Sequence, residues 1–294
     1  MTRLELEAFL TIIKTGSISA AAEQLYVTQP ALSRRIRALE EELGYQLFLR
    51  NKGIRSITLT PEGQAFISVA EKWNLIYREA LAISTLKQKP VLNVSSVGSI
   101  STYLLPNVFR RIIAEESPYN LCFHNYHSYE AYDYVASGLI DIALISDDMY
   151  HKTVTTTPAF REPFVLIGGP AWDSIETIHP SRLDPRKEIR LPWNPEFDAW
   201  HEHWFDVTIY PKVLLDQMSL LEEFLTDDYF AVAPLIVAGR LRGGNMHICR
   251  LEEGPEDEII YYLTCHGQKR PLIDHFLTLL RNELKSYEGI YSFL

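Results

Sequence analysis

The stretch Ser17-Ile-Ser-Ala-Ala-Ala-Glu-Gln-Leu25, followed after two residues by Thr28-Gln-Pro-Ala-Leu-Ser33, decides the fold of the N-terminal part of this chain. Each half begins with a hydroxyl residue, and a Ser or Thr at that position caps a helix by accepting a hydrogen bond from a free amide of the first turn. A proline is tolerated near a helix start because its missing N–H would have no partner there. The stretch therefore predicts two helices joined by a turn at Tyr26 and Val27.

Apolar residues at helical spacing extend this pattern in both directions. Those between Leu4 and Ile13 predict a first helix that ends near Gly16, and the helix that begins at Gln29 continues to Leu43. Gly44 is expected to end it, since glycine readily adopts the left-handed conformation that follows many helices. The N-terminal part is thus expected to be a bundle of three short helices.

The outer face of the third helix carries side chains of the kinds that read DNA. Gln pairs with adenine in two places, Arg pairs with guanine, and Ser and Thr reach phosphates or base edges. The side chains expected on this face are Gln29, Ser33, Arg34 and Arg37, with Arg35 beside them. A solvated polar face on an ordinary three-helix bundle explains the helix pattern equally well.

The net charge of -10 hides a basic head and an acidic body. Of the 294 residues, the first 90 carry 12 Lys and Arg against 9 Asp and Glu, whereas the remaining 204 carry 16 against 29. A basic segment suits a polyanion, and an acidic one stays soluble and avoids DNA. A chain of this length holds two or three domains, so the charge pattern favours two domains with separate tasks.

The basic head resembles the DNA-binding domain of the LysR-type transcriptional regulators. The resemblance runs without a gap over about 60 residues and adds to the two quoted motifs Ile36, Leu39-Glu40, Leu43-Gly44, Leu47-Phe48 and Arg50. Thr28 stands where the family more often has Ser, and it keeps the capping hydroxyl. The resemblance implies an all-α winged helix-turn-helix that binds double-stranded promoter DNA.

Residues 51–60 are interpreted as the wing of that domain. Lys52-Gly53 offers a tight turn, and basic residues here would lie along phosphates or reach into a minor groove. In a second interpretation, Arg50 is structural and bridges the wing to the helices. The segment is a residue or two longer than is usual in the family, which leaves the placement of Arg55 open. The residues expected at DNA are Ser17, Thr28, Gln29, Pro30, Ser33, Arg34, Arg35, Arg37, Arg50, Lys52 and Arg55.

A linker helix is expected to begin at Pro61 and to end before Pro90. Its small and aromatic residues recur with a period of 3.5, which suits a two-helix coiled seam. These residues are Phe66, Ala70, Trp73, Tyr77, Ala80 and Ser84. An amphipathic helix packed on its own domain explains the same spacing. The resemblance favours the seam and implies a homodimer or homotetramer that reads the half-sites of an imperfect palindrome.

The acidic body alternates strands with helices, which predicts parallel βαβ units. Strands are expected at 91–97, 120–126 and 140–145, a second set begins near Phe164, and 258–265 crosses back before a last helix at 271–286. Two lobes joined by two crossings are similar to the periplasmic-binding-protein-like (type 2) effector domain of LysR-type regulators.

The expected fold class is therefore α/β with an N-terminal winged helix-turn-helix. We expect a DNA-binding domain at 1–60, a linker and dimerisation helix at 61–89, and an effector-binding domain at 90–294. Within the effector domain, the first lobe is expected at about 90–161 and 266–294, and the second at about 162–265.

Short polar residues follow the expected strands of the body. Ligands of open α/β sheets bind beyond the carboxyl ends of the strands, where hydroxyls and free helix amides hold polar or anionic groups. The residues expected to bind a small-molecule effector are Ser99, Ser101, Thr102, His127, Ser128, Ser146, Trp193, Asn194, Met218 and Ser219. Ser99 and Ser128 stand where the family places effector-contacting hydroxyls. Taken singly, each serine is explained equally well as a helix cap.

Aromatic residues cluster between Trp193 and Trp204. Such a cluster serves either as the core of a lobe or as an aromatic wall for a planar effector. His201 and His203 are two residues apart, which does not suit the i, i+4 pair of a helical metal site. We expect neither a metal nor a cofactor.

The expected function is that of an effector-responsive transcription factor, and not of an enzyme. The chain has no Gly-x-Ser-x-Gly elbow, no phosphate-binding Gly-x4-Gly-Lys loop and no Cys-x2-Cys pair. Its apolar runs are too short for a membrane helix, Glu5 and Glu7 do not suit a signal peptide, and three cysteines without paired spacing fit a cytoplasmic protein.

The resemblance implies that effector binding changes the angle between dimers and thereby recruits RNA polymerase. An effector-independent architectural DNA-binding protein is the alternative, but it would not need an acidic body of this size.

Overall fold

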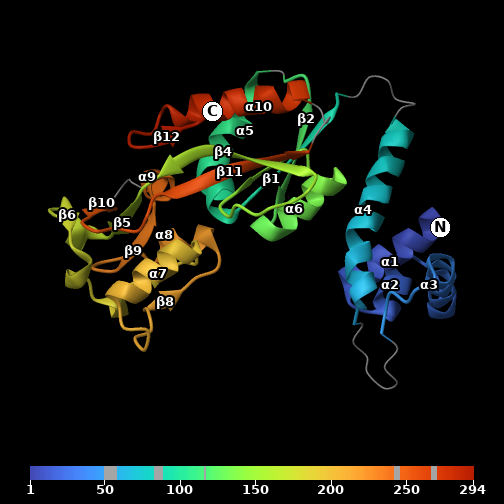
Figure 1. Cartoon of the computed structure of the whole chain (residues 1–294). Helices are drawn as coiled ribbons and strands as arrows, with labels where there is room; N and C mark the ends of the chain where they lie inside the picture. The colour runs from blue at the N-terminus through green and yellow to red at the C-terminus, as the bar shows by residue number, and fades with distance from the viewer. Residues whose placement is uncertain (50–57, 83–88, 116, 242–245, 266–269) are drawn as a thin grey trace. The chain divides into compact units, whose positions relative to one another are not determined.

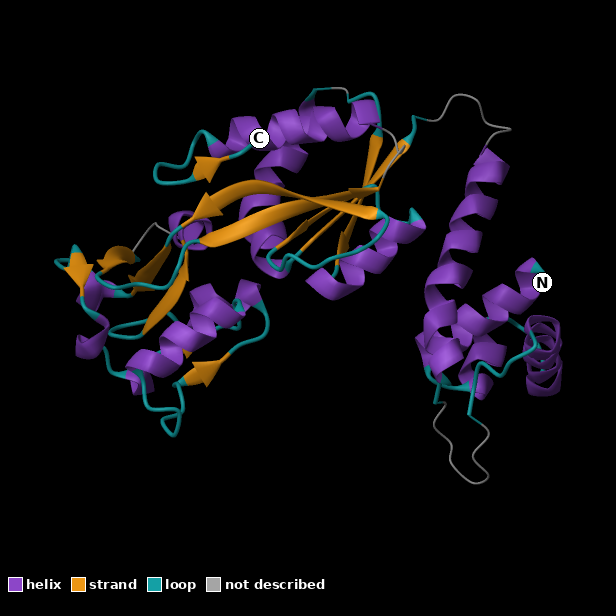
Figure 2. Cartoon of the chain, in the orientation of Figure 1, coloured by secondary structure: helices purple, strands orange, loops and turns teal. Residues whose placement is uncertain are grey.

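The computed structural model describes residues 1–49, 58–82, 89–115, 117–241, 246–265 and 270–294. The chain divides into an N-terminal unit, Met1–Gln88 with the short segment Ser137–Leu139, and a C-terminal unit, Lys89–Ala136 and Ile140–Leu294 (Figure 1). Helices dominate the first unit, whereas the second combines helices with sheets (Figure 2). Within these ranges, no helix has both the length and the apolar character that a membrane crossing requires.

The helices that the structure describes in the N-terminal unit are α1 (Arg3–Thr15), α2 (Ile18–Gln24), α3 (Gln29–Leu43) and α4 (Pro61–Ala82). Both predicted caps are confirmed. The Ser17 hydroxyl accepts a hydrogen bond from the Ala20 amide, and the Thr28 hydroxyl accepts one from the Ala31 amide, each at 3.4 Å. The two motifs therefore encode the starts of α2 and α3 directly.

The predicted helix ends are confirmed as well. Gly16 follows α1 with φ 65°, and Gly44 follows α3 with φ 79°. Tyr26, in the turn between α2 and α3, also lies in the left-handed region with φ 55°, and its side chain is 96% exposed. Because few side chains adopt this conformation without strain, the turn is sharply defined.

The core of the N-terminal unit forms around Phe9, whose ring centroid lies 5.5 Å from that of Phe48 and 5.2 Å from that of Phe66. Phe66 and Ala70, in the first half of α4, are buried in this core. The prediction that these two residues form the dimer seam is wrong, because their side chains already pack against their own unit. The alternative of a helix packed on its own domain describes this half of α4.

Several other residues of α4 are more open to solvent. Trp73 and Tyr77 are half-buried and stack with ring centroids 5.4 Å apart, and Ala80 is exposed. Val69 and Ile76, which are seven residues apart on the same helix, are 50% and 55% exposed. Ser84, also predicted for the seam, lies outside the described residues.

The C-terminal unit contains a six-stranded sheet in the order β12-β4-β11-β3-β1-β2. Its strands are β1 (Val91–Ser96), β2 (Asn120–Asn125), β3 (Ile142–Ile145), β4 (Val154–Glu162), β11 (Glu258–Cys265) and β12 (Tyr291–Ser292). β1 pairs in parallel with β2 and β3, which confirms the predicted βαβ units. β11 runs antiparallel to β3 and β4.

Helices cover both faces of this sheet, as the alternation along β3 shows. Ile142 and Leu144 pack in the cluster that contains residues of α5 (Leu105–Ala114) and α10 (Arg270–Leu284). Ala143 and Ile145 pack in a second cluster with residues of α6 (Ser128–Ser137). All four side chains are fully buried, as expected of a strand whose two faces are both covered. A π-helical turn, η1 (Ile100–Leu104), precedes α5.

A second sheet has the order β6-β10-β5-β9, and a strand pair, β7 with β8, accompanies it. The strands are β5 (Phe164–Gly168), β6 (Thr177–Ile178), β7 (Ile189–Arg190), β8 (Val213–Leu214), β9 (Phe230–Pro234) and β10 (His247–Leu251). The helices are α7 (Pro195–Trp204), α8 (Leu221–Phe224) and α9 (Leu235–Leu241), with 3-10 turns η2 (Pro170–Trp172), η3 (Pro180–Arg182), η4 (Pro185–Lys187) and η5 (Met218–Leu220). The unit thus has two lobes, one for each sheet.

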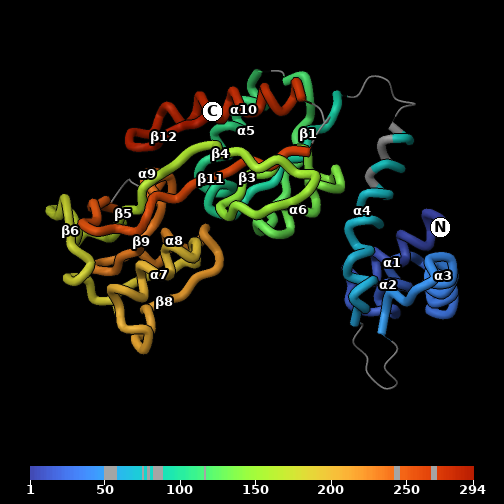
Figure 3. The backbone as a smooth tube through the Cα atoms, in the orientation of Figure 1, coloured from blue at the N-terminus to red at the C-terminus, as the bar shows by residue number. Residues whose placement is uncertain are grey.

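The strands β4 and β11 run side by side and carry the chain between the two lobes (Figure 3). Glu162 of β4 lies opposite Glu258 of β11, and both side chains are buried. Glu162 accepts a hydrogen bond from the Ile236 amide at 2.7 Å. Burial raises the pKa of both carboxyl groups well above their ordinary value, and the proximity of Glu258 raises the pKa of Glu162 further.

We predict that Glu162→Gln removes a pH-dependent loss of stability. Between the ordinary carboxyl pKa of 4.5 and the raised native value, the native state holds a proton that the unfolded chain has released, so the free energy of unfolding falls as the pH rises. Gln is uncharged and keeps an acceptor for the Ile236 amide. The variant should therefore match the wild type near pH 4.5 and exceed its stability at pH 8 by at least about 1 kcal/mol, or about 2–4 °C in Tm.

Thermal unfolding between pH 4.5 and pH 8 measures this difference, with the exposed Glu176→Gln as the matched control. A stability difference between Glu162→Gln and the wild type that stays constant over this range would contradict the interpretation.

Candidate functional site

The polar face of α3 offers a candidate nucleic-acid interface. Arg34 and Arg37 are exposed, Arg35 and Ser33 are half-buried, and Gln29 is exposed one residue after the capping Thr28. The Gln29 side chain lies 3.5 Å from the Ser19 hydroxyl, so α2 supports the start of this face. Ser17 and Thr28 act as helix caps, and Pro30 occupies the first turn of α3. The structure thus brings Gln29, Ser33, Arg34 and Arg37 together on one side of α3, and Arg35 lies at its flank.

The base of the wing is a short antiparallel pairing. Phe48 bridges to Leu59, the Leu49 amide donates to the Thr58 carbonyl at 2.8 Å, and the Thr60 amide donates to the Leu47 carbonyl at 3.0 Å. The buried carboxylate of Glu40 accepts a hydrogen bond from the Leu47 amide at 2.8 Å and so ties this pairing to α3. The predicted DNA contacts Arg50, Lys52 and Arg55 lie outside the described residues.

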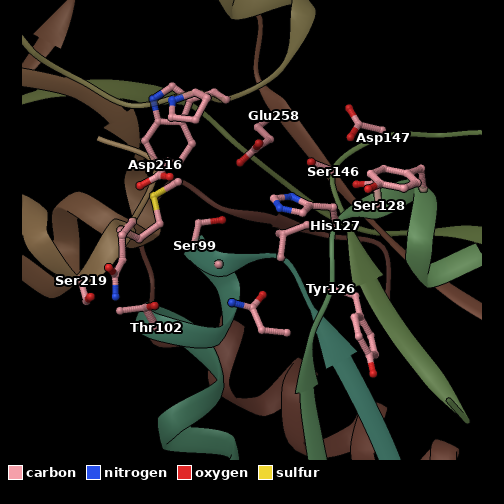
Figure 4. A pocket seen from close by; sticks show the side chains of 18 of the residues that line it. Ser99, Thr102, Tyr126, His127, Ser128, Ser146, Asp147, Asp216, Ser219 and Glu258 are labelled. Carbon is pink, nitrogen blue, oxygen red and sulfur yellow. The ribbon is translucent and has the colours of Figure 1, made fainter. Parts of the chain in front are cut away.

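The C-terminal unit contains a cavity of about 590 Å³ between its two lobes (Figure 4). One wall consists of residues that follow the carboxyl ends of the parallel strands β1, β2 and β3, as expected for an open α/β sheet. The other wall belongs to the second lobe and includes Pro192, Trp193 and residues 216–219. The volume is within the range of small-molecule sites.

Eight of the ten predicted effector residues line this cavity. They are Ser99, Thr102, His127, Ser128, Ser146, Trp193, Met218 and Ser219. The other two do not line it. The Ser101 hydroxyl donates to the Gly98 carbonyl at 3.0 Å, and the Asn194 side chain caps α7 by accepting a hydrogen bond from the Phe197 amide at 2.8 Å. For Ser101 and Asn194, a local structural role therefore replaces the predicted contact.

The cavity wall also contains residues that the sequence did not single out. They include Asn125, Tyr126, Asp147, Asp216, Gln217 and Glu258. Asn125 and Asp147 adjoin predicted positions and follow from the same strand-end rule. Glu258 and Asp216 enter the wall through the tertiary fold, which local sequence does not reveal.

A hydrogen bond connects the two lobes at Met218, a residue of the cavity wall. The Tyr103 hydroxyl, on η1, donates to the Met218 carbonyl at 2.7 Å. Burial raises the pKa of Tyr103 to about 12, and the charge of Glu222 adds to the rise. Tyr103 therefore keeps its proton, and this donor, throughout the physiological pH range.

The aromatic cluster of the second lobe is mainly core. Trp193 lines the cavity and donates from its indole N–H to the Val232 carbonyl at 2.9 Å. Trp200 packs against Phe197 and donates to the Glu253 carbonyl at 2.7 Å. Trp204 packs edge-on against His179, with ring centroids 4.9 Å apart. Only Trp193 of the three tryptophans thus belongs to the cavity wall.

Two family models match the two units. The model described as "Bacterial regulatory helix-turn-helix protein, lysR family" matches residues 4–64, and the model "LysR substrate binding domain" matches residues 87–285. Together they cover the polar face of α3 and the cavity.

Curated relatives have similar sequences. The HTH-type transcriptional regulator CysB of Haemophilus influenzae is 30% identical over 46% of this chain and 42% of its own length, and the regulatory protein NocR of Agrobacterium fabrum is 29% identical over 64% and 63%. The chain therefore spans only about half the length of several of these relatives. A probable nitrogen assimilation transcriptional activator of Synechocystis is 31% identical over 77% of this chain and 68% of its own length.

Solved structures share the fold. CbnR, a LysR family transcriptional regulator, superposes with a TM-score of 0.70 at 19% identity, covering 96% of this chain and 99% of CbnR. CbnR in complex with its target DNA gives a TM-score of 0.69 at 18% identity, covering 96% and 100%. The family models and the curated relatives together establish that the chain belongs to the LysR family of bacterial helix-turn-helix regulators.

Proposed function

We propose that this protein is a DNA-binding transcriptional regulator that senses a small molecule in the cavity of its C-terminal unit. The observation that carries the proposal is the cavity itself, where eight residues expected from the sequence meet between two lobes. A helix-turn-helix unit on the same chain supplies a way to act on DNA. The basic head and the acidic body keep the two tasks separate.

The polar face of α3 is proposed to enter the major groove. Arg34 and Arg37 would contact base edges, with Gln29 at the start of the helix, while the capping residues Ser17 and Thr28 would lie near phosphates. The wing residues Arg50, Lys52 and Arg55 are proposed as further phosphate or minor-groove contacts.

A homodimer would place two such helices on two half-sites of a palindrome. The open part of α4, with Val69, Trp73, Ile76, Tyr77 and Ala80, is the proposed pairing surface. A tetramer built from two dimers, a cytoplasmic location and a contact with RNA polymerase are parts of the same proposal.

Effector binding is proposed to act by closing the two lobes on the ligand. A molecule that contacts both walls binds the closed arrangement more tightly than the open one, and this difference in affinity stabilises the closed arrangement. The chain carries none of the nucleophile or phosphate-loop motifs of the common enzyme classes, and no chemical step is proposed. An architectural DNA-binding protein, the alternative, would bind DNA without any ligand-dependent change.

We predict that Arg34→Ala weakens binding to a specific operator by about 1–3 kcal/mol, because a guanidinium that pairs with a base carries that share of the discrimination. Fluorescence anisotropy on an operator duplex and on a scrambled duplex of equal length measures the effect. Arg182→Ala removes an exposed Arg from the C-terminal unit and should change neither affinity. Unchanged affinity and unchanged site preference in Arg34→Ala would refute the assignment of this face.

We predict that the double substitution Ser99→Ala and Ser128→Ala abolishes the response to effector and leaves DNA binding intact. Both hydroxyls are buried at the cavity, and removing them leaves the polar groups of a ligand unpaired. The readout is the thermal shift produced by compounds of a metabolite collection that stabilise the wild type.

The matched control is Ser101→Ala, because this serine does not line the cavity. A double variant that responds as the wild type does would show that the cavity is not the effector site.

A further inference from the structure

The cavity wall concentrates acidic side chains. Asp147 follows β3, Asp216 comes from the second lobe, and Glu258 begins β11. Among the described residues that line the cavity there is neither Lys nor Arg, and His127 is the one lining side chain that becomes cationic on protonation. A ligand in this cavity therefore meets three carboxyl groups that no fixed cation of the wall offsets.

Glu258 is the most constrained of the three. Its side chain is 3% exposed, and its Oε2 atom is buried without a hydrogen-bond partner within the described structure. Figure 4 shows its carboxyl group directed into the space bordered by Ser99, His127 and Asp216. A buried carboxyl group without partners is costly to the fold, so its placement here indicates a binding partner that is supplied from outside.

The surroundings of Glu258 increase this cost. Glu162 lies opposite Glu258 across the strand pair, and Asp147 is close enough for its charge to raise the pKa of Glu258, although burial is the larger cause. A cation beside Glu258 reverses this balance, since an opposite charge within hydrogen-bond distance favours the ionised carboxylate.

A second polar group at the wall also lacks a partner. The Ser128 hydroxyl, at the start of α6, is 5% exposed, and its oxygen has no hydrogen-bond partner in the described structure. It offers an acceptor to a donor on the ligand, as an ammonium group would provide.

The cavity wall is less suited to an anionic ligand. The start of α6 would attract an anion, but the Glu130 carboxylate already accepts a hydrogen bond from the His127 amide there at 3.1 Å. The Asp147 and Asp216 carboxylates of the wall would repel an anionic ligand. A bare metal ion is not favoured either, since the residues that the structure describes include no group of three or more His, Cys, Asp or Glu arranged to hold one.

We infer that the effector carries a cationic amine, as an ammonium or guanidinium group, and that this group binds Glu258 and Asp147 with the Ser128 hydroxyl beside them. The inference rests on the proposed effector function of the cavity. Trp193 and Met218 line the opposite wall and offer apolar surface to the rest of the molecule. Charge-assisted hydrogen bonds of this kind are about twice as strong as neutral ones, so charge decides which ligands bind.

Three probes of similar size isolate the role of charge, namely benzylamine, benzyl alcohol and benzoate. Calorimetric titration of the full chain at one salt concentration and neutral pH measures the affinity for each probe. Benzylamine should bind at least about tenfold more tightly than benzyl alcohol, because a hydrogen bond to a charged group is stronger than one between neutral groups, and benzoate should bind most weakly.

Two variants connect this preference to the wall. Glu258→Gln keeps the shape of the side chain and removes the charge, and it should lower benzylamine affinity by at least about fivefold while the affinity for benzyl alcohol stays unchanged. Asp147→Asn, at a half-buried position, should act in the same direction if Glu258→Gln fails to fold. Glu288→Gln, an exposed carboxylate away from the cavity, is the matched control and should bind as the wild type does.

The outcomes separate the inference from the proposed function. Binding of benzoate or benzyl alcohol as tight as that of benzylamine, if lost in the double substitution at Ser99 and Ser128, would overturn the cationic class and keep the cavity as an effector site. Equal loss of all three probes in Glu258→Gln, or binding of none of them to the wild type, would also overturn the inference. The regulator function itself depends on DNA selection, which these titrations do not involve.

Discussion

The pairing of β4 with β11 is the constraint on which the C-terminal unit depends. The two strands share eight residue pairs, from Glu258 with Glu162 to Cys265 with Val154, and the register shifts between Ile260 and Tyr261. They belong to the six-stranded sheet and lead into and out of the second lobe (Figure 1). The position of the cavity between the lobes, and of Glu258 in its wall, follows from this crossing. The register shift between Ile260 and Tyr261 is typical of a β-bulge, which bends a strand and increases its twist.

The sequence predicts the structure correctly where a local rule determines it. Helix caps at Ser17 and Thr28, glycines at helix ends and strand-end polar residues depend on a few neighbouring positions, and the structure agrees with them. The strand β4 escaped prediction because its buried and exposed residues do not alternate and because it contains Pro158, a residue type that is rare within strands. The helix α9 also escaped prediction, because the apolar residues of β9 run directly into those of α9.

The dimer seam and the acidic wall show the limits of the sequence. A period of 3.5 on α4 does not determine whether a residue packs against a second subunit or against its own. In the structure, Phe66 and Ala70 are buried in the core of their own unit. Glu258 begins a strand, where a carboxylate usually meets water, and only the packing of both lobes buries it. Charged residues are thus distributed unevenly at two levels. Basic residues predominate in the head and acidic residues in the body, and within the body several carboxyl groups line the cavity.

The function proposed for this chain is that of a sequence-specific regulator. Selection of sheared genomic DNA on the purified full-length protein at physiological salt, followed by sequencing, tests it most directly. We predict enrichment of a few intergenic regions that contain an interrupted palindrome, since paired recognition helices read two half-sites. Broad enrichment that vanishes steeply as salt increases would mean charge-driven binding alone and would contradict the account.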